Sequence, residues 1–206
     1  MIISLYNVKG GVGKTTSLIN LSAVAKKKGK TLIIDSDIQQ ASAYFFNLKN
    51  KKSSPFIKKT EYKSLDLIPY EFKNKIDLNT LKNDYDFIFI DAPAGIENEV
   101  LNIIKHSDLI IVPILPNLLS LRTYNEIIKM NLSKNVKLLL NRYENTALHK
   151  HIVKNILKLP SSQYFKNYIP KSERIEIMPF IKKSVIDKYP TSKEANVYKK
   201  VFEEII

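Results

Sequence analysis

The chain opens with an apolar run, a glycine-rich loop and an amphipathic segment, and this order constrains the fold more than any other feature. Residues 2–6 (IISLY) have the composition of a buried strand, and residues 14–28 repeat apolar positions at helical spacing before Gly29. A second apolar run, TLIID, follows at 31–35. A strand, a loop, a helix and a second strand in this order form a βαβ unit, which has a right-handed crossover and parallel strands.

The same alternation continues along the chain, so one α/β domain over residues 1–206 is expected. Unbroken apolar strands between helices predict a doubly wound, mostly parallel twisted sheet with helices on both faces. Residues 48–64 interrupt the alternation, and we expect a basic, mobile surface excursion there. The further strands are expected at 65–70, 86–91, 109–114, 136–141 and 165–169, and the further helices at 118–131, 146–158 and 193–206.

Composition narrows the class of protein. The sequence has no cysteine, which excludes disulfides, thiolate zinc sites and iron–sulfur clusters. No apolar run approaches the ~18 residues of a membrane span, and the first residues lack the pattern of a secretion signal, so a cytoplasmic protein is expected. The net charge of +13 favours a polyanionic partner such as nucleic acid. Coding bias toward lysine is the alternative explanation of that charge.

The loop GGVGKT has the composition of a phosphate-binding loop. The usual pattern is G-x-x-x-x-G-K-[ST], but Val8 stands where the first glycine is expected, and Lys9 adds a charge. Glycines without a Cβ let phosphate oxygens approach the backbone N–H groups at a helix N-terminus. Because Val8 falls at the end of the strand, we expect its side chain to be accommodated without harm to the loop.

Three carboxylates follow apolar strands and are expected beside this loop. Asp35 and Asp37 end the run IIDSD, and Asp91 ends the run DFIFID. The carboxyl ends of parallel strands meet at one edge of the sheet, where ligands bind. An aspartate after four apolar residues is typical of the position that holds Mg²⁺ in nucleotide-binding proteins.

With these residues in place, the sequence resembles the ParA/MinD family of deviant Walker A ATPases, a branch of the P-loop NTPases. The segment that carries the resemblance is KGGVGKTT at 9–16, and the similarity extends over nearly the whole chain. In that family the lysine at the position of Lys9 reaches across a nucleotide sandwich dimer to the partner's phosphates. The resemblance therefore implies an ATPase with slow intrinsic turnover that binds ATP and Mg²⁺ and forms a homodimer.

The resemblance also implies a role for each matching position. Lys14 would hold the β/γ-phosphates, Thr15 the Mg²⁺ and Thr16 the α-phosphate. We expect catalytic roles for Lys9 and Lys14. The nucleotide-contacting loop is then Lys9, Gly10, Gly11, Val12, Gly13, Lys14, Thr15 and Thr16.

The same comparison covers the acidic and base-contacting residues. Asp35 and Asp91 would hold Mg²⁺ through water, and Asp37 would act catalytically by orienting or activating the attacking water. Two further segments, LLLNRYE and YIPKSERIE, match the places where the family contacts adenine. The expected adenine contacts are Asn141, Arg142, Pro170 and Lys171.

Two branches of the family remain as alternatives. DSDIQQASA, IPKSERIE and the C-terminal segment resemble small single-domain partition ATPases, whereas DAPAGIE resembles the MinD type. The acidic ending VFEEII differs from the basic membrane helix of MinD proteins, so we favour plasmid or chromosome partition. The loop begins at residue 9, so no DNA-reading domain is expected before it. A membrane-associated regulator of division-site or cargo placement is the first alternative, and a P-loop metabolic enzyme is the second.

The partition branch implies two partners. One is non-specific DNA on the nucleoid, bound through phosphate contacts in the ATP state. The other is a small ParB- or ParG-like centromere-binding protein that stimulates hydrolysis. The cations expected to contact DNA are Lys171, Arg174, Lys182, Lys183, Lys199 and Lys200.

Overall fold

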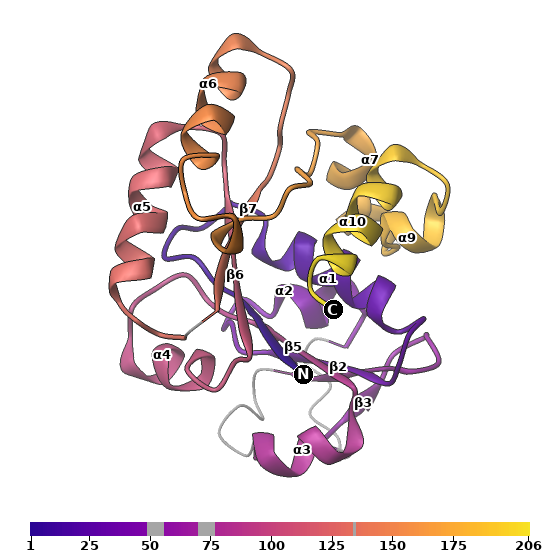
Figure 1. The fold of residues 1–206 in the computed structure, drawn as a ribbon. Coiled ribbons are helices and arrows are strands. Elements are labelled where there is room, and N and C mark those ends of the chain that lie inside the picture. Colours follow the sequence, from indigo (N-terminus) through magenta and orange to yellow (C-terminus); the bar gives the residue numbers. More distant parts are fainter. Residues whose placement is uncertain (49–55, 70–76, 134) are drawn as a thin grey trace.

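A seven-stranded sheet forms the centre of the part of the chain that the computed structural model describes, residues 1–48, 56–69, 77–133 and 135–206 (Figure 1). The strand order is β3-β4-β2-β5-β1-β6-β7, and every neighbouring pair except β3–β4 is parallel. The central β1 lies where the strand order reverses, which is the place where ligands bind in open α/β sheets. The strands are β1 (Ile2–Leu5), β2 (Thr31–Asp35), β3 (Lys58–Lys59), β4 (Leu65–Ile68), β5 (Phe87–Asp91), β6 (Leu109–Ile114) and β7 (Val136–Leu140).

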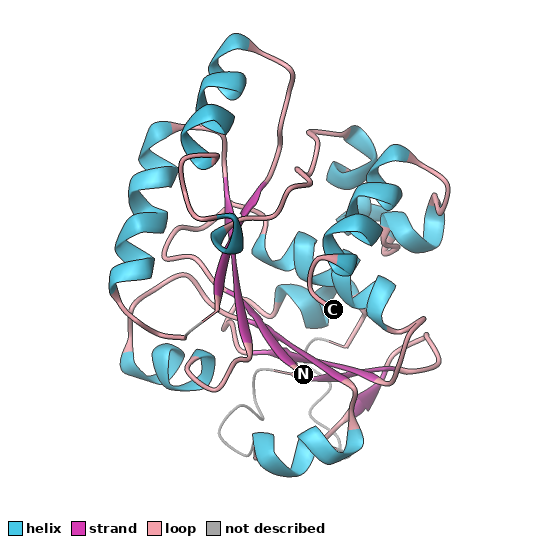
Figure 2. Ribbon diagram, in the orientation of Figure 1, coloured by secondary structure: helices cyan, strands magenta, loops and turns pink. Residues whose placement is uncertain are grey.

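Helices cover both faces of the sheet (Figure 2). One face packs against α1, α2 and the C-terminal helices α8–α10, and the other packs against α3–α6. The helices are α1 (Lys14–Ala25), α2 (Ala41–Phe45), α3 (Leu78–Asp84), α4 (Asn98–Ile104), α5 (Leu118–Lys129), α6 (Ala147–Ile156), α7 (Glu173–Glu176), α8 (Met178–Ile181), α9 (Val185–Lys188) and α10 (Lys193–Glu203).

Alternate residues of the central strands pack into apolar layers on opposite faces of the sheet. In β1, Ile3 and Leu5 join the layer under α1 and α10, whereas Ile2 joins the layer under α3. All three side chains are buried. Burial on both faces explains why these strands read as unbroken apolar runs in the sequence.

The structure confirms the doubly wound α/β fold and corrects two local expectations. No strand forms at 165–169: residues near it make only the isolated bridges Leu138↔Tyr164 and Tyr143↔Pro170. The expected excursion at 48–64 contains β3, which pairs antiparallel with β4 and buries Lys58. The stretch 49–55 of that segment lies outside the described residues, as does residue 70 of the expected 65–70 strand.

The expected helices end earlier than their periodicity indicated. The first stops at Ala25, with Lys26 as its C-cap, and the last stops at Glu203. In the ranges that the structure describes, no helix has the length and apolar character needed to cross a membrane.

Candidate functional site

The glycine loop connects β1 to α1 and requires glycine at two of its positions. Gly11 and Gly13 have φ of +73° and +94°, the left-handed region that favours glycine. A Cβ at Gly13 would also lie 2.5 Å from the side-chain nitrogen of Asn141, whereas a Cβ at Gly10 would meet nothing within 4 Å. Val8 packs its side chain partly against the apolar layer of α5 and β6, so the missing first glycine leaves the loop intact.

Lys14 folds back over the loop from the first residue of α1. Its ammonium donates hydrogen bonds to the carbonyls of Asn7 at 3.3 Å and Lys9 at 3.2 Å, and the side chain is buried. Burial lowers the pKa of Lys14, and the carboxylates of Asp91 and Asp37 act in the opposite direction. Because both acceptors are neutral carbonyls, a phosphate oxygen would be a stronger partner for this ammonium.

Two carboxylates lie side by side behind the loop. Asp35 and Asp91 are register partners at the ends of the parallel strands β2 and β5, and both are buried. Asp91 accepts hydrogen bonds from Thr15 Oγ1 at 3.2 Å and from Ser42 Oγ at 2.6 Å. Asp35 accepts one from the backbone N–H of Ala43 at 2.8 Å. The structure thus brings the three expected metal ligands, Thr15, Asp35 and Asp91, to one place.

The electrostatics of this pair suit a divalent cation. Burial raises the pKa of Asp91 to about 6. Burial, followed by the charge of Asp91, raises the pKa of Asp35 to about 8. Two adjacent buried carboxylates repel each other unless a proton or a cation lies between them. Oxygen donors of this kind are the ligands that Mg²⁺ prefers, together with phosphate oxygens and water.

A Mg²⁺ ion at this place would need phosphate oxygens and water as ligands in addition to the protein side chains. In the part of the chain that the structure describes, no group of three or more His, Asp or Glu side chains is arranged to hold a metal ion by itself. A Mg²⁺ ion at Thr15 and the two aspartates would therefore complete its shell with nucleotide phosphates and water, as is usual for this ion.

Asp37 lies at the open side of the loop. Its carboxylate accepts a hydrogen bond from the backbone N–H of Gln39 at 2.9 Å and remains partly exposed. It lines a pocket of about 410 Å³ together with Lys14, Thr15 and Pro93. This position, across the pocket from the loop, is suited to contact a water molecule near the terminal phosphate.

A second pocket of about 480 Å³ adjoins the first and contains three of the four expected adenine contacts. Asn141, Arg142 and Pro170 line it, and Gly13, Thr16 and Arg142 line both pockets. Lys171 is not part of its lining; its ammonium pairs with Glu144 at 3.4 Å.

Asn141 is the best candidate in this pocket for recognition of a base. Its side-chain nitrogen donates to the carbonyl of Val12 at 2.9 Å and to Ser17 Oγ at 3.2 Å. Its buried side-chain oxygen has no hydrogen-bond partner in the described residues. An orphaned acceptor of this kind is costly unless a ligand donates to it, and the exocyclic amine of adenine is such a donor.

Lys9 directly precedes the pocket-lining Gly10 and is half-buried. Its backbone N–H donates to the side-chain oxygen of Asn7 at 2.9 Å, which fixes the start of the loop. Its ammonium forms no ion pair or hydrogen bond with the residues that the structure describes. The charge is therefore available to a ligand or to a second molecule.

Five of the six expected DNA-contacting cations have acceptors within the protein. Arg174 pairs with Glu194 at 3.4 Å, and Lys183 pairs with Glu61 at 2.6 Å. Lys171 pairs with Glu144, Lys182 donates to the carbonyl of Tyr44, and Lys199 donates to the carbonyl of Pro190. Lys200 is exposed and has no such acceptor among the described residues.

One contributor to the site was missed from the sequence. Ser42, on α2, is fully buried and holds one oxygen of Asp91. The sequence signal was a small polar residue shortly after the strand-ending DSD, which is too common a pattern to single out.

A glycine loop at the strand-order reversal, a buried lysine and paired strand-end aspartates define a P-loop nucleotide-binding α/β domain. The chain belongs to the CobQ/CobB/MinD/ParA nucleotide-binding domain family, whose model matches residues 3–185. It is an ATPase of the ParA/MinD type. ATPases of this type act in partitioning or division-site placement.

Individual relatives come from both branches. The sporulation initiation inhibitor protein Soj of Bacillus subtilis is 26% identical over 246 residues, covering 99% of this chain and 97% of Soj. The septum site-determining protein MinD of Helicobacter pylori is 27% identical over 186 residues, covering 77% of this chain and 67% of that MinD. A Borrelia burgdorferi protein described as a plasmid partition protein, solved with AMPPNP, has the same fold. Its TM-score is 0.79 at 24% identity, with 100% of this chain and 99% of that chain covered.

Proposed function

We propose that this protein is a partition ATPase that dimerises on ATP, binds DNA without sequence preference in that state, and segregates plasmid or chromosomal DNA. The observation that carries the proposal is Lys9, a second loop lysine whose ammonium has no ion pair or hydrogen bond with the described residues. A single subunit already supplies Lys14 to the phosphates, so the charge of Lys9 is best explained by a role across a dimer.

In each subunit, ATP extends across the two adjoining pockets. The triphosphate lies on Gly10–Thr16 and the base lies against Asn141 and Pro170, because the pockets share Gly13 and Thr16. Lys14 exchanges its two carbonyl acceptors for β/γ-phosphate oxygens.

The carboxylates supply the metal and water functions. Thr15, Asp35 and Asp91 would hold Mg²⁺, which would supply positive charge to the phosphates. Asp37 orients the attacking water from the open side of the pocket. Burial raises the pKa of both Asp35 and Asp91, so a metal ion there would compete with protons for these carboxylates.

DNA and a second protein complete the cycle. Two subunits present twice as many cations as one, so dimerisation turns weak phosphate contacts into measurable binding. A small ParB- or ParG-like centromere-binding protein stimulates hydrolysis, and an arginine supplied in trans contributes ~10³–10⁵ in rate in related phosphoryl transfers. In this proposal the single domain works in the cytoplasm on the nucleoid.

The second candidate function is MinD-like placement of a division site or cargo at a membrane. The segment DAPAGIE after β5 and the similarity to Helicobacter pylori MinD favour it. The two candidates differ in the polyanionic surface that the ATP state binds.

A binding assay with both surfaces separates these functions. Purified protein is titrated with duplex DNA of unrelated sequence and, in parallel, with anionic liposomes, each with ATP, ADP or no nucleotide. The partition proposal expects ATP-dependent DNA binding and little liposome binding. ATP-dependent liposome binding without DNA binding would establish the second candidate instead, and no ATP effect on either surface would refute both.

A further inference from the structure

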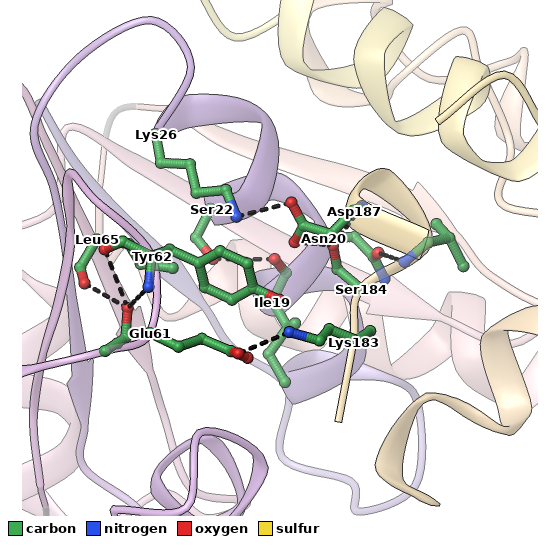
Figure 3. Close-up of polar contacts among 12 residues, drawn as sticks. Ile19, Asn20, Ser22, Lys26, Glu61, Tyr62, Leu65, Lys183, Ser184 and Asp187 are labelled. Carbon is green, nitrogen blue, oxygen red and sulfur yellow. Dashed lines mark hydrogen bonds and ion pairs between the residues drawn. The ribbon is translucent and has the colours of Figure 1, made fainter. Parts of the chain in front are cut away.

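Asn20 is a fully buried amide in α1, one helical turn after Thr16, and none of the roles above uses it. Its side-chain nitrogen donates to the carbonyl of Thr16 at 2.9 Å and to Met178 Sδ at 3.2 Å. Its side-chain oxygen accepts the backbone N–H of Val185 at 3.0 Å. Figure 3 shows Asn20 between α1 and the segment that carries Ser184 and Asp187.

These contacts join the two walls of the base pocket. One wall comes from the loop and the start of α1, including Gly13 and Thr16, and the other includes Ile175 and Pro179. Pro179 directly follows Met178, the sulfur of which contacts Asn20. A shift of α8 away from α1 would therefore break contacts of Asn20 and widen the pocket.

The second wall has little regular structure to hold it in place. Its lining residues come from α7 and α8, each of four residues, and from Tyr198 of α10; the four-residue α9 follows α8 in the chain. Helices this short are not stable by themselves, so side-chain contacts from neighbouring elements must fix their position. Asn20 supplies such contacts at both ends of the stretch from Met178 to Val185.

A second connection lies farther along α1, away from the pocket. Lys26 pairs with Asp187 at 2.8 Å, and its ammonium lies 3.2 Å from the centroid of the Tyr62 ring (Figure 3). This pair fixes the far end of the same segment. Asn20 is the contact that lies within one turn of the pocket-lining Thr16.

We propose that Asn20 is a positioning residue that holds the 175–179 wall against α1 and thereby sets the affinity of the site for the adenosine part of the nucleotide. The proposal rests on the proposed nucleotide site and names a residue that tunes one half of it. The only contact of the Asn20 side chain with the phosphate loop among the described residues is its hydrogen bond to the carbonyl of Thr16. Its contacts with Met178 and Val185 lie outside that loop, so we expect phosphate binding to be independent of them.

The test compares a ligand with a base and one without. Calorimetric titration with ADP and with pyrophosphate, both in Mg²⁺, measures each half of the site without hydrolysis. Asn20→Ala should weaken ADP binding about tenfold and leave pyrophosphate binding within about twofold. The matched control is Ser22→Ala, because Ser22 is equally buried in α1 but donates only to the carbonyl of Ile19 within that helix.

A second variant covers the case in which Asn20→Ala does not fold. Val185 is the first residue of α9, where proline is tolerated, and Ser184 before it has φ −67° and ψ 159°, which suits a following proline. Val185→Pro removes the backbone N–H that donates a hydrogen bond to the Asn20 side-chain oxygen, and it leaves Asn20 itself in place. It should show the same selective loss of ADP affinity.

The outcomes separate this inference from the proposal on which it rests. Equal weakening of ADP and pyrophosphate, or no change in either, in the folded variants would overturn the role of Asn20. Wild-type protein that binds ADP no more tightly than pyrophosphate would instead show that the second pocket does not bind adenosine.

Discussion

At the scale of single residues, Lys9 and Lys14 have opposite environments although they belong to one loop. Lys14 is buried and donates to the carbonyls of Asn7 and Lys9, whereas the ammonium of Lys9 has no partner among the described residues. A buried, preorganised ammonium suits phosphate binding in its own subunit. An ammonium without such partners is available to a second molecule, so substitutions of the two lysines should affect nucleotide binding and dimer assembly separately.

Changing Lys9 to Ala should therefore abolish ATP-dependent dimers while ATP binding by the monomer stays within about threefold of wild type. The physical reason is that a charge acting in trans is lost while the contacts of Lys14 remain. Sedimentation with ATP and a non-hydrolysable analogue measures assembly. Lys27→Ala, which removes an exposed charge beyond the end of α1, is the control. Dimers of Lys9→Ala that persist with ATP would disprove the role in trans.

The glycines of the loop make a second prediction at this scale. Alanine at Gly13 meets both a left-handed backbone and the Asn141 amide at 2.5 Å, whereas alanine at Gly10 meets open space. We expect Gly13→Ala to destabilise the protein without ligand by about 2 kcal/mol, or a fall of about 4–8 °C in Tm. Gly10→Ala should change stability by less than about 1 kcal/mol. Thermal unfolding measures both, and equal Tm values for the two variants would contradict the argument.

At the scale of elements, α1 organises the molecule around the site. Its first turn carries Lys14 and Thr15, its middle carries Asn20, and Lys26 is its C-cap. Lys26 is buried against Tyr62, which lies in the turn between β3 and β4, and against Asp187 in α9 (Figure 3). One helix thus connects the phosphate loop, the antiparallel edge of the sheet and the C-terminal helices.

The Lys26–Asp187 pair should be far more important for stability than an exposed pair. Their side chains are 7% and 15% exposed, so Asp187→Ala leaves a buried ammonium without its carboxylate. We expect a loss of about 3 kcal/mol in urea unfolding, and a partial recovery in the Lys26→Met, Asp187→Leu double variant.

The control is the exposed pair of Lys129 and Glu126, in which the side chains are 72% and 61% exposed. Lys129→Ala should cost less than about 1 kcal/mol. Similar losses for Asp187→Ala and Lys129→Ala would mean that burial does not control the strength of the ion pair.

Helices were predictable from the sequence where the periodic apolar pattern is long, and strands were predictable where both faces of the strand are buried. The central strands and α1, α5, α6 and α10 fall within the expected ranges, and the strand-end aspartates Asp35 and Asp91 follow from strand ends meeting at one edge. The four-residue helices α7–α9 carry too few turns for a periodic signal. Residues 165–169 have strand-like composition but form no strand, and the isolated bridges lie at the flanking Tyr164 and Pro170, because tertiary packing decides such short segments.

The hydrogen-bond partners of side chains were harder to predict from the sequence than the place of each motif residue in the fold. The loop lysine and the acidic residues are readable because their chemistry follows from the motif. The contacts of Ser42 with Asp91 and of Asn20 with Val185 join segments that are 49 and 165 residues apart in sequence. No local pattern encodes such a contact, since it depends on how the C-terminal helices pack against α1.

At the scale of the whole molecule, an acidic cluster at the site contrasts with a strongly basic chain. The site gathers Asp35, Asp37 and Asp91 around a cation and phosphates, while the chain as a whole carries a net charge of +13. Most of the cations expected to contact DNA are also engaged with internal acceptors. DNA phosphates must therefore compete with those acceptors, and the free cations should dominate the binding.

The salt dependence of DNA binding tests this competition. If each subunit of an ATP-bound dimer meets three phosphates, the slope of log K against log salt should be near −5, from about six contacts at ~0.9 each. Lys200→Ala removes from each subunit a cation that has no acceptor among the described residues, and should make the slope shallower by about 2. Lys171→Ala is the matched variant and should change the slope less, because Glu144 already neutralises part of that charge. Equal slopes for the two variants, or a larger change for Lys171→Ala, would show that the internal ion pairs open when DNA binds.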